Sequence, residues 1–322
     1  MSTTVAGPSL ITRLTGWTLQ PLALRRLALA SVIVNVGIVV TGGAVRLTNS
    51  GLGCPTWPAC SGSDPLPTHE FGIHKAVEFS NRMLTFVVGV VLVLTLIAAW
   101  RQRTERRLAT LAFLGVPAQA VLGGIVVLTN LNPWLVAPHF LLSAVIIAIT
   151  FVLWTRISGV QVVAAPTPVL WLARGLAVVT ALVLVAGTVV TGTGPHAGDP
   201  DKNGRIHRIH LSTSGATQLH ADLVMVLVGL TVGLVALSYA LSSAGVLRRA
   251  VLVMLGVVLA QGVIGYTQYF LHVPALLVGF HMLGACLVWL AALRVLLVVD
   301  PRLATPAGVR DSGAVAAPRP VG

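Results

Sequence analysis

Charged side chains are scarce in this chain: Asp, Glu, Lys and Arg together make up 9% of its 322 residues, and only 9 residues are acidic. Soluble globular domains carry about 25% charged residues. Hydrophobic residues account for 56% of the sequence instead. This composition excludes an ordinary soluble domain and indicates an integral membrane protein.

Basic blocks interleaved with aromatic residues, which are typical of nucleic acid-binding surfaces, are also missing. The sequence pI of about 11.3 comes from arginines that lie in the short gaps between apolar runs. Membrane topology explains this placement, because basic residues collect on the cytoplasmic side of a membrane. We therefore expect the chain to contact membrane lipids and no nucleic acid.

Apolar windows long enough to span a bilayer, about 20 residues each, recur along the chain. They fall at 27–46, 77–99, 108–129, 134–154, 170–192, 219–241, 248–271 and 275–297. The first window follows two arginines, as in a signal peptide, but it has the length of a spanning helix and no clear cleavage pattern. The sequence therefore predicts an all-α integral membrane protein with eight transmembrane helices.

An internal repeat divides these helices into two sets of four. Segments 118–139 and 260–281 share the pattern A-Q-x-V-x-G followed by L-V-x-x-H, and one constant offset carries His139 onto His281. A weaker echo, V-V-T-G, occurs at 39–42 and 189–192. Because an even number of helices returns the chain to its starting side, we expect two parallel four-helix bundle repeats.

The arginines also predict the orientation of the chain. They flank the apolar windows on the side that holds both termini, so we expect both termini to be cytoplasmic. The two longest loops, about 47–76 and 193–218, then face outward. The expected divisions are a cytoplasmic N-terminal tail (1–23), an N-terminal repeat (24–159), a C-terminal repeat (160–299) and a disordered cytoplasmic tail (300–322).

Histidines mark candidate sites near the outer ends of these helices. A single histidine in a membrane helix is most often a packing residue, but His139 and His281 at repeat-equivalent positions indicate two related sites. His220 is expected at the same depth as His281 in the second half. Two neutral imidazoles facing each other across a bundle suit the axial positions of a haem iron. A zinc site needs three or four ligands, and no Cys/His cluster has that spacing.

The first half carries a different set of polar residues. Four of them share one face where the second helix enters the membrane: His74, Glu78, Asn81 and Arg82. Asn81 stands where a counterpart of His220 is expected. A haem in this half would be bound through His139, with His74 or an open position opposite. Glu78 and Arg82 also fit a local ion pair.

Two of the three cysteines, Cys54 and Cys60, lie in the first outer loop. On the predicted topology this loop faces an oxidising compartment, so a disulfide is the expected state and a redox role is the alternative. Cys286 lies inside the last helix, where we expect an inert packing residue.

The first outer loop reads G-G-A-V-R-L-T-x-S-G-L-x-C-P-x-W-P-x-C at 42–60, and E-x-x-N-R follows at 78–82. Together with the repeated histidines, these motifs resemble the haem A synthase family over roughly 24–298. The resemblance implies an oxidoreductase that converts the C8 methyl group of haem O to a formyl group. The product, haem A, would serve cytochrome oxidase. The expected partners are a haem O synthase, which would deliver the substrate, and the oxidase assembly machinery.

The resemblance also implies roles for individual residues. His220 and His281 would be the axial ligands of a haem b cofactor in the C-terminal half, and His139 would contact the substrate haem. Glu78 falls on the family's glutamate implicated in the oxidation, so it is the expected catalytic residue. The rarity of Lys beside Arg is typical of a GC-rich bacterial gene. We therefore expect a multi-pass protein of the bacterial cell membrane, with its haem sites toward the outer face.

One position departs from the family motif. Asn81 replaces the motif histidine, and helical spacing offers His74 as a substitute contact to the substrate haem. Arg46 and Arg82, among the outer basic residues, are candidates to bind haem propionates, and for each a solvated side chain is the alternative. Cys54 and Cys60 match the loop cysteine pair of many members.

Two other classes of protein fit part of the pattern. A quinol-linked membrane haem b cytochrome would explain the histidines but needs neither Glu78 nor the difference between His220 and Asn81. A duplicated transporter would place broken helices at mid-membrane. Here Pro133, Pro138 and Pro274 cluster near the outer helix starts instead, as do most of the polar residues.

Overall fold

The computed structural model of the chain describes residues 16–54, 56–57, 72–196, 198–200, 203–241 and 245–304. Within these ranges every regular element is a helix, and eight helices are long and apolar enough to cross a membrane, which confirms the predicted fold class. They are α2 (Pro21–Leu47), α3 (Ile73–Arg101), α4 (Arg106–Leu128), α5 (Pro133–Ser158), α6 (Thr167–Thr193), α7 (Thr213–Ala240), α8 (Gly245–Phe270) and α9 (Ala275–Val299).

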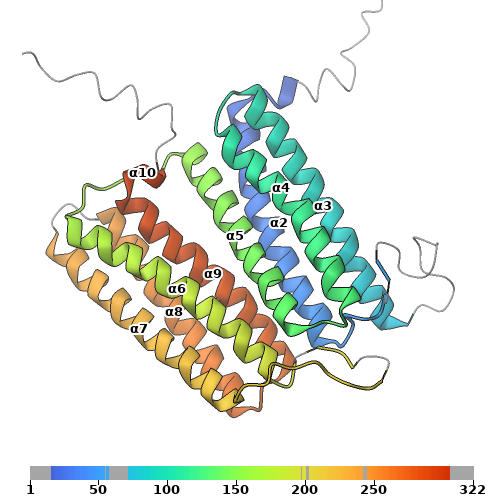
Figure 1. Cartoon of the computed structure of the whole chain (residues 1–322). Coiled ribbons are helices and arrows are strands. Elements are labelled where there is room, and N and C mark those ends of the chain that lie inside the picture. Colours follow the sequence, from blue (N-terminus) through green and yellow to red (C-terminus); the bar gives the residue numbers. More distant parts are fainter. Residues whose placement is uncertain are drawn as a thin grey trace, which may run out of the picture.

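The eight helices form two rings of four (Figure 1). In the first ring α2, α3, α4 and α5 each contact the next helix, and α5 closes the ring onto α2. Helices α6 to α9 form the second ring in the same order. Each ring therefore places its second and fourth helices on a diagonal, with their side chains available to the interior.

The backbone repeats the duplication seen in the sequence. The short turns α4–α5 and α8–α9 each put two successive residues in the left-handed region: Asn130 and Leu131 at φ 52° and 56°, and His272 and Val273 at φ 59° and 62°. Left-handed backbone is rare for leucine and valine. The offset between the two pairs equals that between His139 and His281, which supports the repeat interpretation. The boundaries 24–159 and 160–299 stay a prediction.

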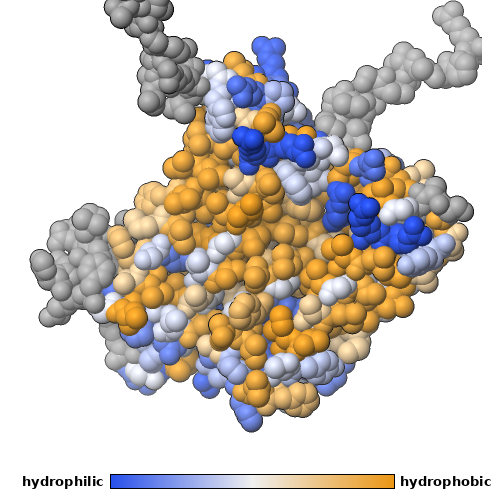
Figure 2. Space-filling view, turned by 180° about the vertical axis from the view of Figure 1, so that it is seen from behind, coloured by the Kyte–Doolittle hydropathy of each residue, from blue (hydrophilic) through white to orange (hydrophobic). Residues whose placement is uncertain are grey.

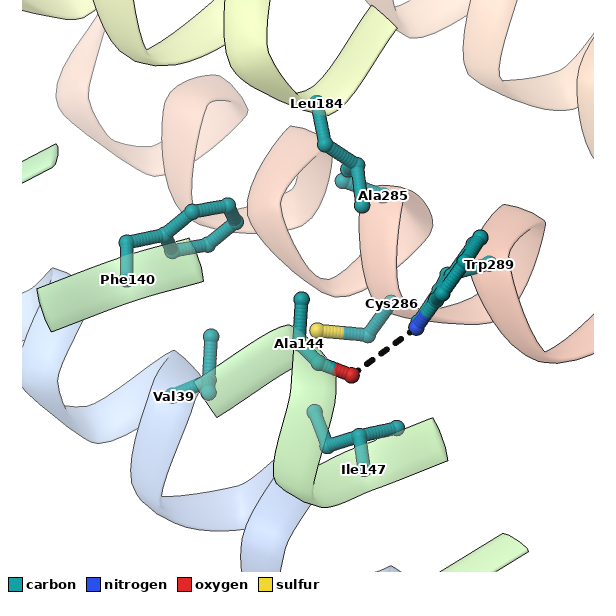
Figure 3. A pocket seen from close by; sticks show the side chains of 8 residues that line it. All are labelled: Val39, Phe140, Ala144, Ile147, Leu184, Ala285, Cys286 and Trp289. Atoms are coloured by element: carbon teal, nitrogen blue, oxygen red, sulfur yellow. Dashed lines mark hydrogen bonds between the residues drawn. The ribbon is translucent and has the colours of Figure 1, made fainter. Parts of the chain in front are cut away.

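The two rings meet through α2, α5, α6 and α9. At their centre the indole Nε1 of Trp289 donates a hydrogen bond to the carbonyl of Ala144, at 2.9 Å (Figure 3). Beside this bond lies an apolar cavity of about 10 Å³, lined among others by Phe140, Leu184 and Cys286. A cavity of this size holds one water at most. The rings are therefore packed closely at this level.

The surface agrees with a membrane setting. Figure 2 shows hydrophobic residues over the middle of one face and hydrophilic residues toward its upper and lower ends. Many large side chains of the helices point outward, such as Phe86 at 68% exposure and Val263 at 67%. In a bilayer these side chains would contact lipid rather than water.

The start of the C-terminal tail differs from the expected disorder. Pro301–Ala304 forms one helical turn, α10, and Asp300 caps it by accepting a hydrogen bond from the backbone N–H of Arg302 at 3.0 Å. Asp300 also pairs with Arg174 at 2.8 Å, and Arg156 donates to the carbonyl of Leu303. The turn is ordered because these charged side chains hold it, which the Pro/Ala-rich composition did not indicate.

The hydrogen bond between the rings can be tested with Trp289→Phe. Loss of this bond should lower the free energy of unfolding by about 1 kcal/mol, measured by thermal unfolding in detergent. Trp134→Phe is the matched control, because Trp134 is 62% exposed. Equal stability of the two variants would contradict a stabilising contact at Ala144.

Candidate functional site

Two histidines face each other inside the second ring. His220 lies in the second turn of α7 and His281 in the second turn of α9, and their ring centroids are 6.4 Å apart with an interplanar angle of 61°. A metal between two imidazoles lies about 2 Å from each ligating nitrogen. When the short distance from each nitrogen to its ring centre is added on both sides, the total matches the separation of the two centroids. The structure therefore brings together the two residues predicted to hold one iron.

Each of these histidines packs against a glycine on the preceding helix. A Cβ added at Gly187 of α6 would lie 3.4 Å from Cε1 of His220, and one at Gly265 of α8 would lie 3.3 Å from Cε1 of His281. The glycines let the imidazoles approach the neighbouring backbone closely. Gln261 of α8 also holds the backbone of α9 at His281, because its Nε2 donates to the carbonyl of His281 at 2.8 Å.

The first ring repeats this arrangement around one histidine. A Cβ added at Gly123 of α4 would lie 3.1 Å from Cε1 of His139, and Gln119 donates to the carbonyl of His139 at 3.1 Å. Gln119 also donates to Ser143 Oγ at 2.7 Å. The site of His139 is therefore built by the same helix contacts as the site of His281.

The three histidines share an unsatisfied ring nitrogen. Among the residues that the structure describes, Nδ1 of His139, His220 and His281 is buried without a hydrogen-bond partner. A buried polar atom without a partner costs about 1–3 kcal/mol. A bound group that orders the rings and engages their nitrogens would offset this cost, so the residues present fit a haem in each ring.

Asn81 takes the place of a histidine on α3. A Cβ added at Gly42 of α2 would lie 3.8 Å from its Nδ2, and Thr41 Oγ1 donates to its Oδ1 at 2.8 Å. Gly42 therefore corresponds to Gly187, because each of these glycines packs against the polar residue of the next helix. Gly192 packs instead against a side chain of the outer loop. The V-V-T-G echo at 39–42 and 189–192 therefore does not align the two rings in space.

Glu78 and Arg82 form the predicted ion pair and also hold the first outer loop. Glu78 is 4% exposed, and its Oε2 accepts the backbone N–H of Cys54 at 2.6 Å while its Oε1 pairs with Arg82. Arg82 donates to the carbonyls of Cys54 and Thr56, both at 3.0 Å. The pair thus binds the loop to the outer end of the first ring through three hydrogen bonds.

Trp57 carries this loop onto the same ring. A Cβ added at Gly124 would lie 2.6 Å from the Trp57 ring, so only glycine admits the indole there. Gly124 follows Gly123, which packs against His139. The loop therefore lies close to the predicted substrate side of the first ring. Sequence analysis missed this contact, although the neighbouring glycines 123 and 124 were a signal for close approach.

The second outer loop reaches across to the first. Asp199 Oδ2 accepts the backbone N–H of Leu52 at 3.0 Å, and Arg46 donates to the carbonyls of His196 and Thr191. The loops of the two halves are therefore joined in both directions. The hydrogen bonds of Arg46 cross to the second half, whereas the sequence had offered this residue as a propionate contact.

His74 lies at the outermost turn of α3. It is exposed, and its Nδ1 is 3.0 Å from Ser50 Oγ. Seven residues separate it from Asn81, which is about 10 Å along a helix. The structure thus places His74 above the level of Asn81 and beside the loop.

Asp199 is an ionisable residue that sequence analysis did not single out. It is 6% exposed, and burial raises the pKa of its carboxyl above the usual 3.8. Hydrogen bonds from Leu52 and Gly51 and the charges of His74 and Arg46 oppose that rise in pKa. Its position in a long loop gave no signal of burial, because the partners come from the other half of the chain.

The predicted disulfide falls partly outside the described residues. Cys54 is fully buried at the loop held by Glu78, but Cys60 is not among the residues that the structure describes, so the Cys54–Cys60 pair stays a prediction. Cys286 is buried in α9 against the cavity between the rings. Its surroundings are apolar, as expected for a packing residue.

Comparison with known proteins gives one family. A family model described as a cytochrome oxidase assembly protein, COX15-CtaA, matches residues 25–293. Several curated relatives carry the name "Heme A synthase". The relative from Alkalihalophilus pseudofirmus is 33% identical over 132 residues, which cover 38% of this chain and 44% of the relative.

Two further relatives of that name show similar coverage. The relative from Halalkalibacterium halodurans is 32% identical over 139 residues, covering 41% of this chain and 46% of its own length. The relative from Exiguobacterium sibiricum is 28% identical over 182 residues, covering 53% and 61%. The matched segments thus span about half the length of these curated relatives.

The burial of Asp199 predicts a pH dependence of stability. Between the usual 3.8 and its raised pKa, the folded state binds more protons than the unfolded state, so this group lowers stability as pH rises through that window. The free energy of unfolding of Asp199→Asn relative to the parent should therefore rise with pH and level off above the raised pKa. Heat unfolding in detergent across acid and neutral pH measures this difference.

Asp222→Asn, which removes an exposed carboxylate on α7, is the matched control. A relative stability of Asp199→Asn that stays constant with pH, or that falls, would contradict a destabilising burial of this carboxylate.

Proposed function

Because the chain belongs to the COX15-CtaA family of cytochrome oxidase assembly proteins, we propose that it is a haem A synthase. It oxidises the C8 methyl group of haem O to a formyl group, and the haem A formed serves cytochrome oxidase. The observation that carries this proposal is the inequality of the two rings. One ring holds two facing histidines 6.4 Å apart, and the other holds His139 with Asn81 in place of a second histidine.

The second ring binds the resident haem b. His220 and His281 would hold its iron, and Gly187 and Gly265 leave their rings room against the neighbouring helices. Gln261 ties α8 to α9 at the level of His281. Haem b bound here supplies a one-electron redox centre. The protein's own contribution is to hold the two imidazoles in fixed positions and to exclude lipid from between them.

The first ring binds the substrate, haem O, through His139. Gln119 and Ser143 fix the backbone of α5 at this residue, as Gln261 does in the second ring. The loop carrying Cys54, Thr56 and Trp57 covers the outer end of the ring. Substrate from a haem O synthase would enter from the membrane, because the apolar porphyrin and its isoprenoid tail partition into lipid.

Glu78 is the proposed catalytic residue. Oxidation of a methyl group releases protons, and a carboxylate at the outer end of the ring can accept them. Its pairing with Arg82 and with the N–H of Cys54 keeps it oriented. Both of its oxygens are engaged, so proton transfer would require Glu78 to give up one hydrogen-bond partner. Because the Cys54 N–H and Arg82 both connect Glu78 to the loop, this loss would loosen the loop at that point.

The proposed setting is the bacterial cell membrane, with both termini cytoplasmic and both haem sites toward the outer face. Arginines at the inner end support this orientation. Two of them form ion pairs there, Arg156 with Glu105 at 3.1 Å and Arg174 with Asp300 at 2.8 Å. The repeats 24–159 and 160–299 then correspond to the substrate and cofactor halves.

The direct test supplies haem O and an electron acceptor in aerated buffer to purified protein in lipid, because oxidation of the methyl group releases electrons. The extracted haems are identified by chromatography and mass. The parent should retain haem b and convert haem O to haem A. His281→Ala should lose haem b and conversion together. His210→Ala, which changes an exposed histidine of the outer loop, is the matched control. Conversion that survives the loss of haem b would contradict the assigned cofactor site.

A second test separates the two roles of Glu78. Glu78→Gln keeps an acceptor for the Cys54 N–H but removes the charge, whereas Glu78→Ala removes both. If Glu78 accepts protons, both variants should lose about 10²–10⁴-fold in conversion rate. Glu105→Gln breaks a comparable ion pair at the inner end and should keep the parent rate. Full activity of Glu78→Gln beside an inactive Glu78→Ala would reduce Glu78 to a loop anchor.

A further inference from the structure

The side of the first ring opposite His139 is built around an amide, not an imidazole. Asn81 lies on α3 and His139 on α5, the diagonal pair of the first ring, as His220 and His281 lie on the diagonal pair of the second. Asn81 also meets Gly42 as His220 meets Gly187. Asn81 therefore occupies the place in the first ring that His220 occupies in the second.

The amide is held in one orientation. Thr41 Oγ1 donates to Asn81 Oδ1 at 2.8 Å, the shorter of its two hydrogen bonds, the other being to the carbonyl of Ile38 at 3.2 Å. With Oδ1 engaged by Thr41, the remaining polar group of the side chain is Nδ2, which only donates. Asn81 thus keeps its N–H groups to donate at this level of the ring.

The second ring lacks the residue that orients this amide. Because Gly42 corresponds to Gly187, Thr41 corresponds to Ala186, which is buried at 7% exposure and has no polar side chain. Threonine thus accompanies asparagine in one ring, and alanine accompanies histidine in the other. The two differences belong together physically. A partly buried amide needs a hydrogen-bond donor for its oxygen, which Thr41 supplies, whereas an imidazole that ligates iron has no oxygen to satisfy.

We propose that the first ring holds its haem through His139 alone, and that Asn81, positioned by Thr41, donates an N–H to the small ligand on the opposite side of the iron. This inference rests on the proposed function, because it assumes haem in the first ring. The hydrogen-bond donors of a distal pocket decide which ligands an iron binds. His74 does not fill that side, because it lies about 10 Å farther out and is engaged with Ser50.

Carbon monoxide is a suitable probe, because it binds reduced iron only where an axial position is open and its stretching frequency reports nearby donors. In reduced protein loaded with haem b and haem O, the parent should bind CO at haem O and not at haem b. Asn81→His should abolish this binding and give a second low-spin spectrum. The infrared C–O band of Asn81→Asp and of Thr41→Val should shift from that of the parent, with CO still bound.

A second test introduces the residues of the first ring into the second ring, so that it needs no variant of the first ring. Ala186→Thr combined with His220→Asn should give the second ring an open position, so that haem b gains CO binding. Retention of haem b spectra in the first-ring variants shows that each has folded, because the second ring is unchanged in them.

Three outcomes would overturn the inference: a parent whose haem O is low-spin and inert to CO, a C–O band unchanged in Asn81→Asp and Thr41→Val, or a first ring that binds no haem. The last would remove the proposed function as well. CO binding at haem O with the expected shifts, but without conversion to haem A, would leave this site assignment standing and contradict the proposed function alone.

Discussion

Every polar side chain that enters the membrane layer of this protein has to find its partner within the chain, because lipid offers none. Most of them do. Ser31 and Thr95 bond each other at 2.9 Å between α2 and α3, and Trp289 donates across the ring interface. Among the residues that the structure describes, Nδ1 of three outer-end histidines is buried without a partner, which supports the proposal that a bound group completes these sites.

Duplication supplies two versions of one scaffold, and small changes at equivalent positions separate their uses. A glycine beside the histidine and a glutamine bonded to the histidine's carbonyl recur in both rings. On the proposed function, the presence of Asn81 instead of a histidine, together with Thr41 instead of an alanine, would change what faces the iron in the first ring. The outer loops then join the rings, because Arg46 and Asp199 each bond the loop of the other half.

Much of this arrangement could be predicted from the sequence, because it depends on local pattern. Apolar runs predicted the eight helices, and one constant offset predicted that His139 and His281 are equivalent. Contacts between segments distant in the chain could not be predicted. The burial of Asp199 depends on Leu52, the seat of Trp57 depends on Gly124, and the turn at 301–304 depends on Asp300. The register of Thr41 with Ala186 needed coordinates too, since the V-V-T-G echo suggested a different alignment.

On the proposed function, one duplicated bundle holds two unequal haem sites, one closed by two histidines and one left open by Asn81. Electron paramagnetic resonance of the oxidised protein loaded with haem O distinguishes these two kinds of site. We expect two separate signals, a low-spin signal from the ring of His220 and His281 and a high-spin signal from the ring of His139. Two low-spin signals, or a single haem signal under saturating haem O, would contradict this expectation.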